Sequence, residues 1–236
     1  MERLWGSKRT EGEGQEAHWL SVADLMAGLM MVFLFIAIAL MRNALIERDQ
    51  IREIAVAYQD NQVAIYEALM AEFRADLKAW DAQIAEDLSF RFRSPDVLFE
   101  VGSEEIRPRF REILSDFFPR YLDILQRFRD SIDEVRIEGH TSSVWNQGVT
   151  PTEAYFLNMD LSQGRTRSVL EYVYLLPQTA DEQGWIKRHF AAVGFSSARP
   201  VLTGDGVEDR ARSRRVTFRV ITNAEVQIRR ILEQSQ

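Results

Sequence analysis

Apolar residues form one long, nearly uninterrupted run close to the N-terminus of the 236-residue chain. Between Trp19 and Met41 the only ionisable side chain is Asp24, and apolar side chains would surround a helix on every side. About 20 helical residues cross a hydrocarbon core of ~30 Å, whereas a helix packed on a protein surface keeps a polar face. The run therefore predicts a transmembrane helix over 19–41, preceded by a tail over 1–18.

A buried core helix and a cleaved signal peptide are the alternatives. Ala37-Ile38-Ala39 resembles a cleavage site, but the apolar run exceeds the usual signal-peptide length of about 7–15 residues and contains an acid. Three basic residues precede the run and three follow it: Arg3, Lys8, Arg9, Arg42, Arg48 and Arg52. The flanking charges therefore do not decide the orientation of the span.

Asp24 is the candidate functional residue of the span. A carboxylate in hydrocarbon is costly, so intramembrane acids usually face a protein interior or a water path. Small side chains at Ala27, Gly28 and Ala37 would let another helix approach closely. The pattern favours proton or ion transfer through Asp24, with an interfacial position or a packing role as the alternatives.

Residues 42–94 repeat apolar side chains at intervals of three or four. The repeat comprises Tyr66, Leu69, Phe73, Leu77, Trp80, Ile84 and Leu88. This spacing predicts a helical linker with one apolar stripe. The stripe can be buried by a second copy of the chain or by the chain's own C-terminal part, and the sequence leaves both open.

The pattern changes after Pro95 to short alternating segments and amphipathic helices. Ser103 is the expected N-cap of the first helix, with Glu104 and Glu105 in its first turn. The order of elements predicts an α+β fold over 95–236, with a βαβαββ mixed sheet and helices on one face. The expected strands cover 97–101, 135–139, 191–193 and 215–220, and the expected helices cover 104–129, 160–175, a short segment ending near 189, and 224–234.

Composition removes several functional classes. A net charge of −7 argues against nucleic-acid binding. The absence of cysteine excludes thiol nucleophiles, disulfides and cysteine-bound zinc. The three histidines are far apart in the sequence, and no Ser-His-Asp or paired-carboxylate spacing is present. The sequence therefore predicts no metal site, no cofactor and no enzymatic activity.

Polar residues that could bind a ligand gather near the expected start of the 160–175 helix. Free backbone N–H groups and the helix dipole would favour an anion there, and Arg165 could clamp the same anion. A solvated surface side chain is the alternative for Arg165. Five further arginines are predicted to be surface charge: Arg210, Arg212, Arg214, Arg215 and Arg219.

Four ordered motifs over about 130 residues resemble the signature of OmpA-like peptidoglycan-binding domains. They are Phe99-x-x-Gly-Ser103, Ile137-Glu-Gly-His-Thr141, Asn158-x-x-Leu-Ser-x-x-Arg165 and Arg214-Arg-Val216. The resemblance implies that Asn158 and Arg165 hold the peptide stem of peptidoglycan, with the arginine on the diaminopimelate carboxylate. It also implies that Leu161 and Ser162 shape the pocket.

The second motif departs from the family pattern. The family usually has Asp after the His-Thr pair, and Ser142 stands there in this chain, followed by a longer loop than usual. Thr141 and Ser142 are therefore included among the expected peptidoglycan-binding residues, with ligand affinity or choice open at Ser142.

The complete layout resembles MotB-like stator subunits, which pair a membrane Asp with a wall-binding domain. The span Ser21-x-x-Asp24-Leu-Met-x-Gly28 and the apolar run after it are more similar to the ZorB family of Zorya anti-phage systems. The resemblance implies an inner-membrane, single-pass, proton-driven motor subunit with a cytoplasmic N-terminus and a periplasmic C-terminal domain. It further implies a homodimer inside a ring of MotA-like (ZorA) subunits, with 43–54 as a possible plug. A flagellar MotB-type stator and a static wall anchor without ion transport are the alternatives.

Overall fold

The computed structural model describes residues 11–93, 98–100, 102–145, 148–176 and 179–226. Contacts within the chain divide it into two compact units, residues 1–53 and 54–236. We describe each unit by itself.

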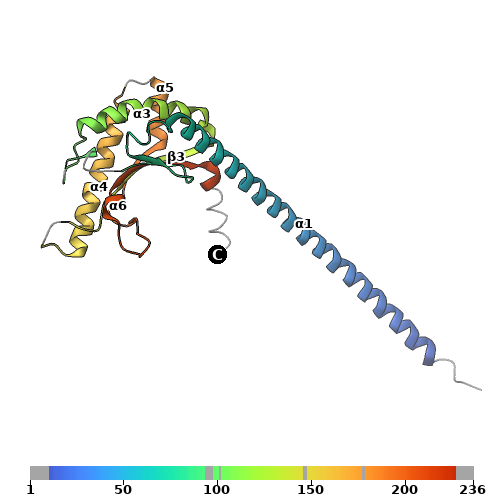
Figure 1. Cartoon of the computed structure of the whole chain (residues 1–236). Helices are drawn as coiled ribbons and strands as arrows, with labels where there is room; N and C mark the ends of the chain where they lie inside the picture. Colours follow the sequence, from blue (N-terminus) through green and yellow to red (C-terminus); the bar gives the residue numbers. More distant parts are fainter. Residues whose placement is uncertain (1–10, 94–97, 101, 146–147, 177–178, 227–236) are drawn as a thin grey trace, which may run out of the picture. The chain divides into compact units, whose positions relative to one another are not determined.

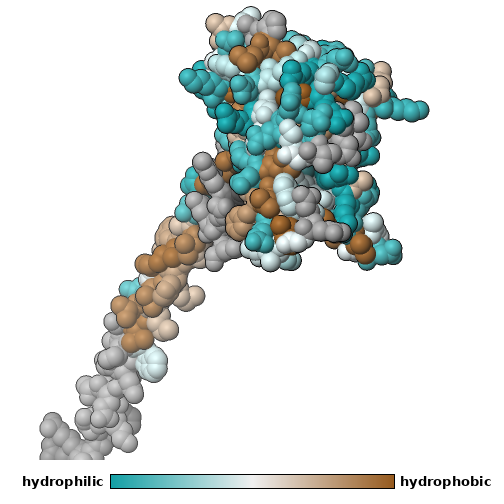
Figure 2. All heavy atoms as spheres, turned by 90° about the vertical axis from the view of Figure 1, so that its left-hand side faces the viewer, coloured by the Kyte–Doolittle hydropathy of each residue, from teal (hydrophilic) through white to brown (hydrophobic). Residues whose placement is uncertain are grey.

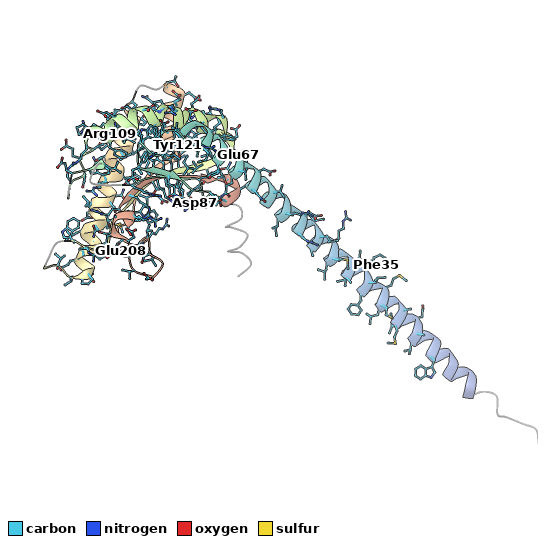
Figure 3. All side chains as sticks on the ribbon, in the orientation of Figure 1. Phe35, Glu67, Asp87, Arg109, Tyr121 and Glu208 are labelled. Carbon is cyan, nitrogen blue, oxygen red and sulfur yellow. The ribbon has the colours of Figure 1, made fainter. Side chains whose placement is uncertain are left out.

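The first unit is dominated by helix α1, which runs from Glu11 to Phe73 and continues into the second unit. Within it, Val22–Ile46 is long and apolar enough to cross a membrane, and none of its hydrophobic window is buried by the protein. Phe35, for example, is 66% exposed and projects from a bare helix surface (Figure 3). On the face seen in Figure 2, apolar side chains in brown follow this part of α1. A buried core helix is therefore excluded, because a core helix would bury these side chains.

The second unit is built on a five-stranded sheet with the strand order β1-β2-β5-β3-β4. The strands are Ala82–Ile84, Ser89–Phe92, Ile132–His140 (β3), Phe190–Gly194 (β4) and Arg215–Thr222 (β5). Only β3 and β4 pair in parallel; the other three pairs are antiparallel. The predicted α+β class with a mixed sheet is therefore confirmed.

Helices cover one face of this sheet (Figure 1). They are α3 (Pro108–Arg127), α4 (Pro151–Tyr174) and α5 (Ala180–His189). An aromatic core joins the elements, with Phe117 of α3 within 5.3 Å, centroid to centroid, of Phe73, Phe90 and Phe218. Such tilted and edge-to-face pairs contribute stability beyond the area that they bury.

The C-terminal turns of α1 belong to this core. Ile65, Leu69 and Phe73 are fully buried, and Arg120 of α3 bonds Glu72 at 2.7 Å and Asp76 at 2.9 Å. For these positions the apolar stripe is thus buried by the chain's own C-terminal part.

The prediction of a helix through residue 94 was wrong for residues 82–92, which form the hairpin of β1 and β2. The helix ends at Phe73, and the chain turns back at Asp81 and Leu88, both with positive φ. Trp80, Ile84 and Leu88 repeat at helical spacing only by coincidence. The alternation of Phe90 and Phe92 is the pattern that indicates a strand here. This strand, β2, pairs with β5, which lies more than 100 residues later in the chain.

Helix α3 begins four residues later than predicted. Pro108 occupies its first turn and Arg107 before it is extended, which suits a residue that precedes proline. Ser103 is therefore not the N-cap, and Glu104 and Glu105 lie outside the helix. The strand expected over 97–101 is reduced, in its described part, to a bridge between Phe99 and Ile106.

Helix α4 begins nine residues earlier than predicted, at Pro151. Thr150 and Glu153 form a capping box, in which each side chain accepts from the other residue's backbone N–H. The other predicted elements of this half, α5, β3, β4 and β5, lie where they were expected. Residues 223–226 are helical, and the rest of the expected final helix lies outside the described residues.

Candidate functional site

Two glycines set the distance between the sheet and α4. Gly139 of β3 and Gly194 of β4 are partners across the parallel ladder. A Cβ on Gly139 would lie 2.6 Å from the Ser162 carbonyl oxygen, and a Cβ on Gly194 would lie 2.7 Å from Ser162 Oγ. Helix α4 can therefore rest directly on the sheet at Ser162 only because both strands carry glycine there.

Three of the predicted ligand residues are engaged within the fold. Ser162 is almost fully buried, and its hydroxyl donates to the Met159 carbonyl and accepts from the Ser196 N–H at 3.1 Å. Asn158 is buried and donates to the Val144 carbonyl. The Thr141 N–H donates to the Ser196 carbonyl at 2.9 Å. These residues hold together the β3 end, the N-terminal half of α4 and the 195–214 loop, which project from the same end of the sheet in Figure 1.

Arg165 joins the first motif to the third. Its Nε donates to the Ser103 carbonyl at 2.9 Å and its Nη2 to the Glu100 carbonyl at 3.0 Å. The guanidinium carbon lies 4.8 Å from the centroid of the Phe99 ring, a cation–π distance. Arg165 is therefore half-buried at a junction of elements rather than fully solvated.

The expectation that the segment Asn158–Arg165 opens a helix was wrong. This segment lies in the interior of α4, two turns beyond its start. Its backbone N–H groups are in the region where an α-helix bonds them to earlier carbonyls, so they offer no anion site of the helix-start kind. An anion-binding role for this segment therefore stays a prediction for the side chain of Arg165.

The four motifs meet at a cavity of about 10 Å³ beside the C-terminal end of β3. Its lining includes Phe99, His140, Thr141, Ser162, Arg165 and Arg215. Thus three predicted site residues, Thr141, Ser162 and Arg165, share one cavity. Half-buried Leu161 and the predicted residues Asn158 and Ser142 are not among those that line it.

Sequence reasoning missed Arg215, which was predicted to be surface charge. It is partly buried, and its guanidinium donates to the Ser213 and Arg199 carbonyls. Burial and the positive charge of Arg91 lower the pKa of Arg215 to about 10. The alternation of β5 held the signal, because Val216 points into the core and Arg215 therefore lies on the other face, opposite His140.

A buried ionisable pair lies beside the cavity. Glu138 and His140 are about 95% buried, with 3.3 Å between Glu138 Oε2 and His140 Nε2, and Arg199 lies 3.7 Å from Glu138 Oε1. Burial lowers the pKa of His140 below its usual 6.5, although Glu138 acts against this. Burial would raise the pKa of Glu138, but the His140 hydrogen bond and nearby arginines outweigh it and lower that pKa.

A carboxylate lies next to the position where Ser142 replaces the family's acid. The Ser143 N–H donates to Glu208 Oε1 at 3.0 Å and its hydroxyl donates to Oε2 at 2.5 Å. Glu208 is brought there by a turn closed by its bridge to Leu202, and Figure 3 shows it on the loop beside α6 (Arg210–Ser213). Nothing in the sequence connects these distant residues.

Asp24 belongs to the other unit, on the exposed surface of the candidate span. Among the described residues, no group of three or more His, Asp or Glu side chains could hold a metal ion.

One candidate membrane span, followed by an α+β domain in which four OmpA-like motifs meet at one cavity, defines a class of membrane-anchored protein. No family model matches the chain. The chain is, however, 54% identical over 235 residues to the Zorya protein ZorB of Escherichia coli strain ATCC 8739. The match covers 99% of this chain and 100% of that relative. The chain belongs to the ZorB family.

Two solved structures are also similar. The cell wall anchor of the T6SS from Pseudomonas aeruginosa is 26% identical, with a TM-score of 0.45, covering 66% of this chain and 97% of that one. A putative MotB like protein from Desulfovibrio vulgaris is 21% identical, with a TM-score of 0.49, covering 73% of this chain and 99% of that one.

Proposed function

We propose that this chain is the wall-anchored B subunit of a proton-driven inner-membrane motor complex used in anti-phage defence. The observation that carries the proposal is the 54% identity to ZorB over 99% of the chain, a match long enough to take in the candidate span as well as the α+β domain. The proposed topology is a single pass with the N-terminus in the cytoplasm and the C-terminal domain in the periplasm. The proposed partners are a second copy of the chain and a surrounding ring of MotA-like (ZorA) subunits.

In this proposal Asp24 carries the proton. An acid in the apolar stretch of a span is too costly to keep unless it faces protein or water, and a bare helix surface offers neither. A partner helix must therefore cover Asp24 in the assembled complex. Loading and release of one proton then changes the local charge, to which the ring subunits respond by moving around the dimer.

The C-terminal domain holds the dimer against the cell wall. Arg165 is the residue assigned to the carboxylate of the peptide stem, with Thr141 and Ser162 in the same cavity and Asn158, Leu161 and Ser142 around it. Arg165 reaches this position because Phe99 supports its guanidinium. Because the anchored domain keeps the dimer stationary relative to the wall, the ring subunits can rotate around the dimer.

Residues 43–54 are assigned a plug role before the wall is engaged. They overlap the end of the candidate span and continue α1 beyond it, and Leu45, Ile46 and Ile51 expose apolar side chains in this segment. Deletion of this segment is expected to cause a proton leak and slow growth, and normal growth would contradict the plug role.

The decisive experiment compares phage plating on cells with the native operon and with Asp24→Asn, at matched protein levels. The amide keeps the size and polarity of the side chain but cannot carry a proton, so protection should be lost. Asp60→Asn, exposed on the same helix beyond both the candidate span and residues 43–54, is the matched control and should protect fully.

Full protection by Asp24→Asn would contradict ion transfer through this residue and favour a static anchor. Lack of protection by the wild type would contradict the defence role, and swimming would then be measured to test a flagellar stator.

A further inference from the structure

The cavity shared by the four motifs is lined by two buried polar atoms that lack a hydrogen-bond partner among the described residues. These atoms are Thr141 Oγ1 and His140 Nδ1. Both residues line the cavity and are about 95% buried. A buried polar atom without a partner is costly, and native proteins keep one where a ligand or water completes its bonding.

The second observation is the charge of Arg215, which lines the same cavity as Arg165. Within the described part of the chain, no carboxylate forms an ion pair with Arg215, and its guanidinium donates to two neutral carbonyls, those of Ser213 and Arg199. Positive charges from Arg91 and Arg199 act on Arg215, and Glu138, which partly offsets them, is shared with His140 at 3.3 Å and with Arg199 at 3.7 Å. A partly buried cation in this setting is under-neutralised, so a negative group nearby would gain from it.

The size of the cavity limits what can enter. A volume of about 10 Å³ has room for a single oxygen-sized group. One oxygen of a carboxylate fits this limit: it could accept from the Thr141 hydroxyl while the guanidinium groups on either side neutralise its charge. A phosphate or a sugar ring is too large for this space.

We propose that Arg215 is a second recognition residue, which binds the peptide-stem carboxylate together with Arg165 and Thr141. This inference rests on the proposed wall-binding function and adds to it a residue on β5. The carboxylate completes the bonding of Thr141 and supplies the negative charge that Arg215 lacks. The site therefore selects a stem that ends in a free acid over one that ends in an amide.

The test measures binding of full-length chain in detergent to two wall peptides, one with the diaminopimelate carboxylate free and one with it amidated. The wild type should bind the free acid at least about tenfold more tightly than the amide, as expected for a charge-assisted contact. Arg215→Gln should weaken binding of the free acid about tenfold and bring the two affinities closer together. Arg215→Lys should restore part of the preference.

Arg212→Gln is the matched control, because Arg212 is exposed on the adjacent α6 and should not change either affinity. A purely structural role for Arg215 predicts equal losses for both peptides with an unchanged acid preference, and that result would overturn the inference. Unchanged binding by Arg215→Gln would also overturn it while leaving the wall-binding function intact. Failure of the wild type to bind purified cell-wall sacculi would instead overturn the wall-binding function and this inference together.

Discussion

At the scale of single residues, the charged groups on the outer face of β3 and β5 are the least ordinary feature of the domain. Glu138 and His140 are buried side by side, and the two arginines whose charges act on His140, Arg199 and Arg215, come from a loop and from the neighbouring strand. His140 also stacks on Phe195, with the rings 10° from parallel. Such a cluster couples the stability of the site to pH.

The structure predicts that the domain loses stability in mild acid through His140. Because burial lowers the pKa of His140, the unfolded state binds a proton more readily, and stability falls as the pH drops below about 6.5. Glu138, Arg199 and Arg215 are the charged groups that act on the ring. Thermal unfolding of the solubilised chain at pH 7.5 and pH 5.5 tests this.

His140→Gln should show a smaller loss of stability between these two pH values than the wild type. An equal loss in both proteins would assign the acid sensitivity to other groups.

At the scale of elements, the contact of α4 with the sheet decides where the site residues lie. Gly139 and Gly194 allow the contact, Ser162 forms it, and the 195–214 loop closes over it through Ser196. Ser196 Oγ also donates to the Tyr155 carbonyl at 2.7 Å, one turn before Asn158. A change of one methyl group at this contact must therefore move the helix that carries Arg165.

Gly139→Ala is expected to destabilise the domain by about 1–3 kcal/mol, the usual cost of overpacking. The new Cβ would meet backbone of α4 at 2.6 Å, which cannot yield without a shift of the helix. Sacculus binding should weaken as well, and both are measured by thermal unfolding and co-sedimentation. Gly204→Ala, whose Cβ would meet nothing within 4 Å, is the control and should behave like the wild type. Unaltered stability in Gly139→Ala would contradict the close approach.

At the scale of the whole molecule, the proposed function divides between two units with separate tasks, ion transfer in the span and anchoring in the α+β domain. Their key residues, Asp24 and Arg165, belong to different compact units. The two tasks should therefore be separable by mutation while both remain necessary for defence.

Arg165→Ala should abolish retention on purified sacculi and, in cells, protection against phage, with membrane insertion unchanged. Asp24→Asn should keep sacculus retention and lose protection. Arg167→Ala, an exposed arginine on the same helix, should change neither. Protection by an Arg165→Ala protein that no longer binds the wall would show that anchoring is dispensable.

The sequence alone determined the features that depend on composition and local pattern. A long apolar run such as 19–41 is compatible with few structures, so it predicts a membrane-spanning helix. The alternation of 215–220 lies within one strand, so it predicts that strand without reference to its partners. The motifs likewise predict Asn158, Thr141 and Arg165 as ligand residues without any knowledge of their contacts, and that prediction awaits the binding experiments.

Tertiary structure decided what depends on partners distant in the sequence. The hairpin at 82–92 forms because β2 pairs with β5, although its apolar residues repeat with helical spacing. The role proposed for Arg215 likewise depends on its place opposite His140 across the sheet. The start of α4 is a different case, because the Thr150–Glu153 capping box is a local signal that the sequence-based prediction missed. In the β2–β5 and β3–β5 pairings, residues more than 70 positions apart in the sequence lie next to each other. The local sequence pattern cannot predict this proximity, because it depends on which strands pair.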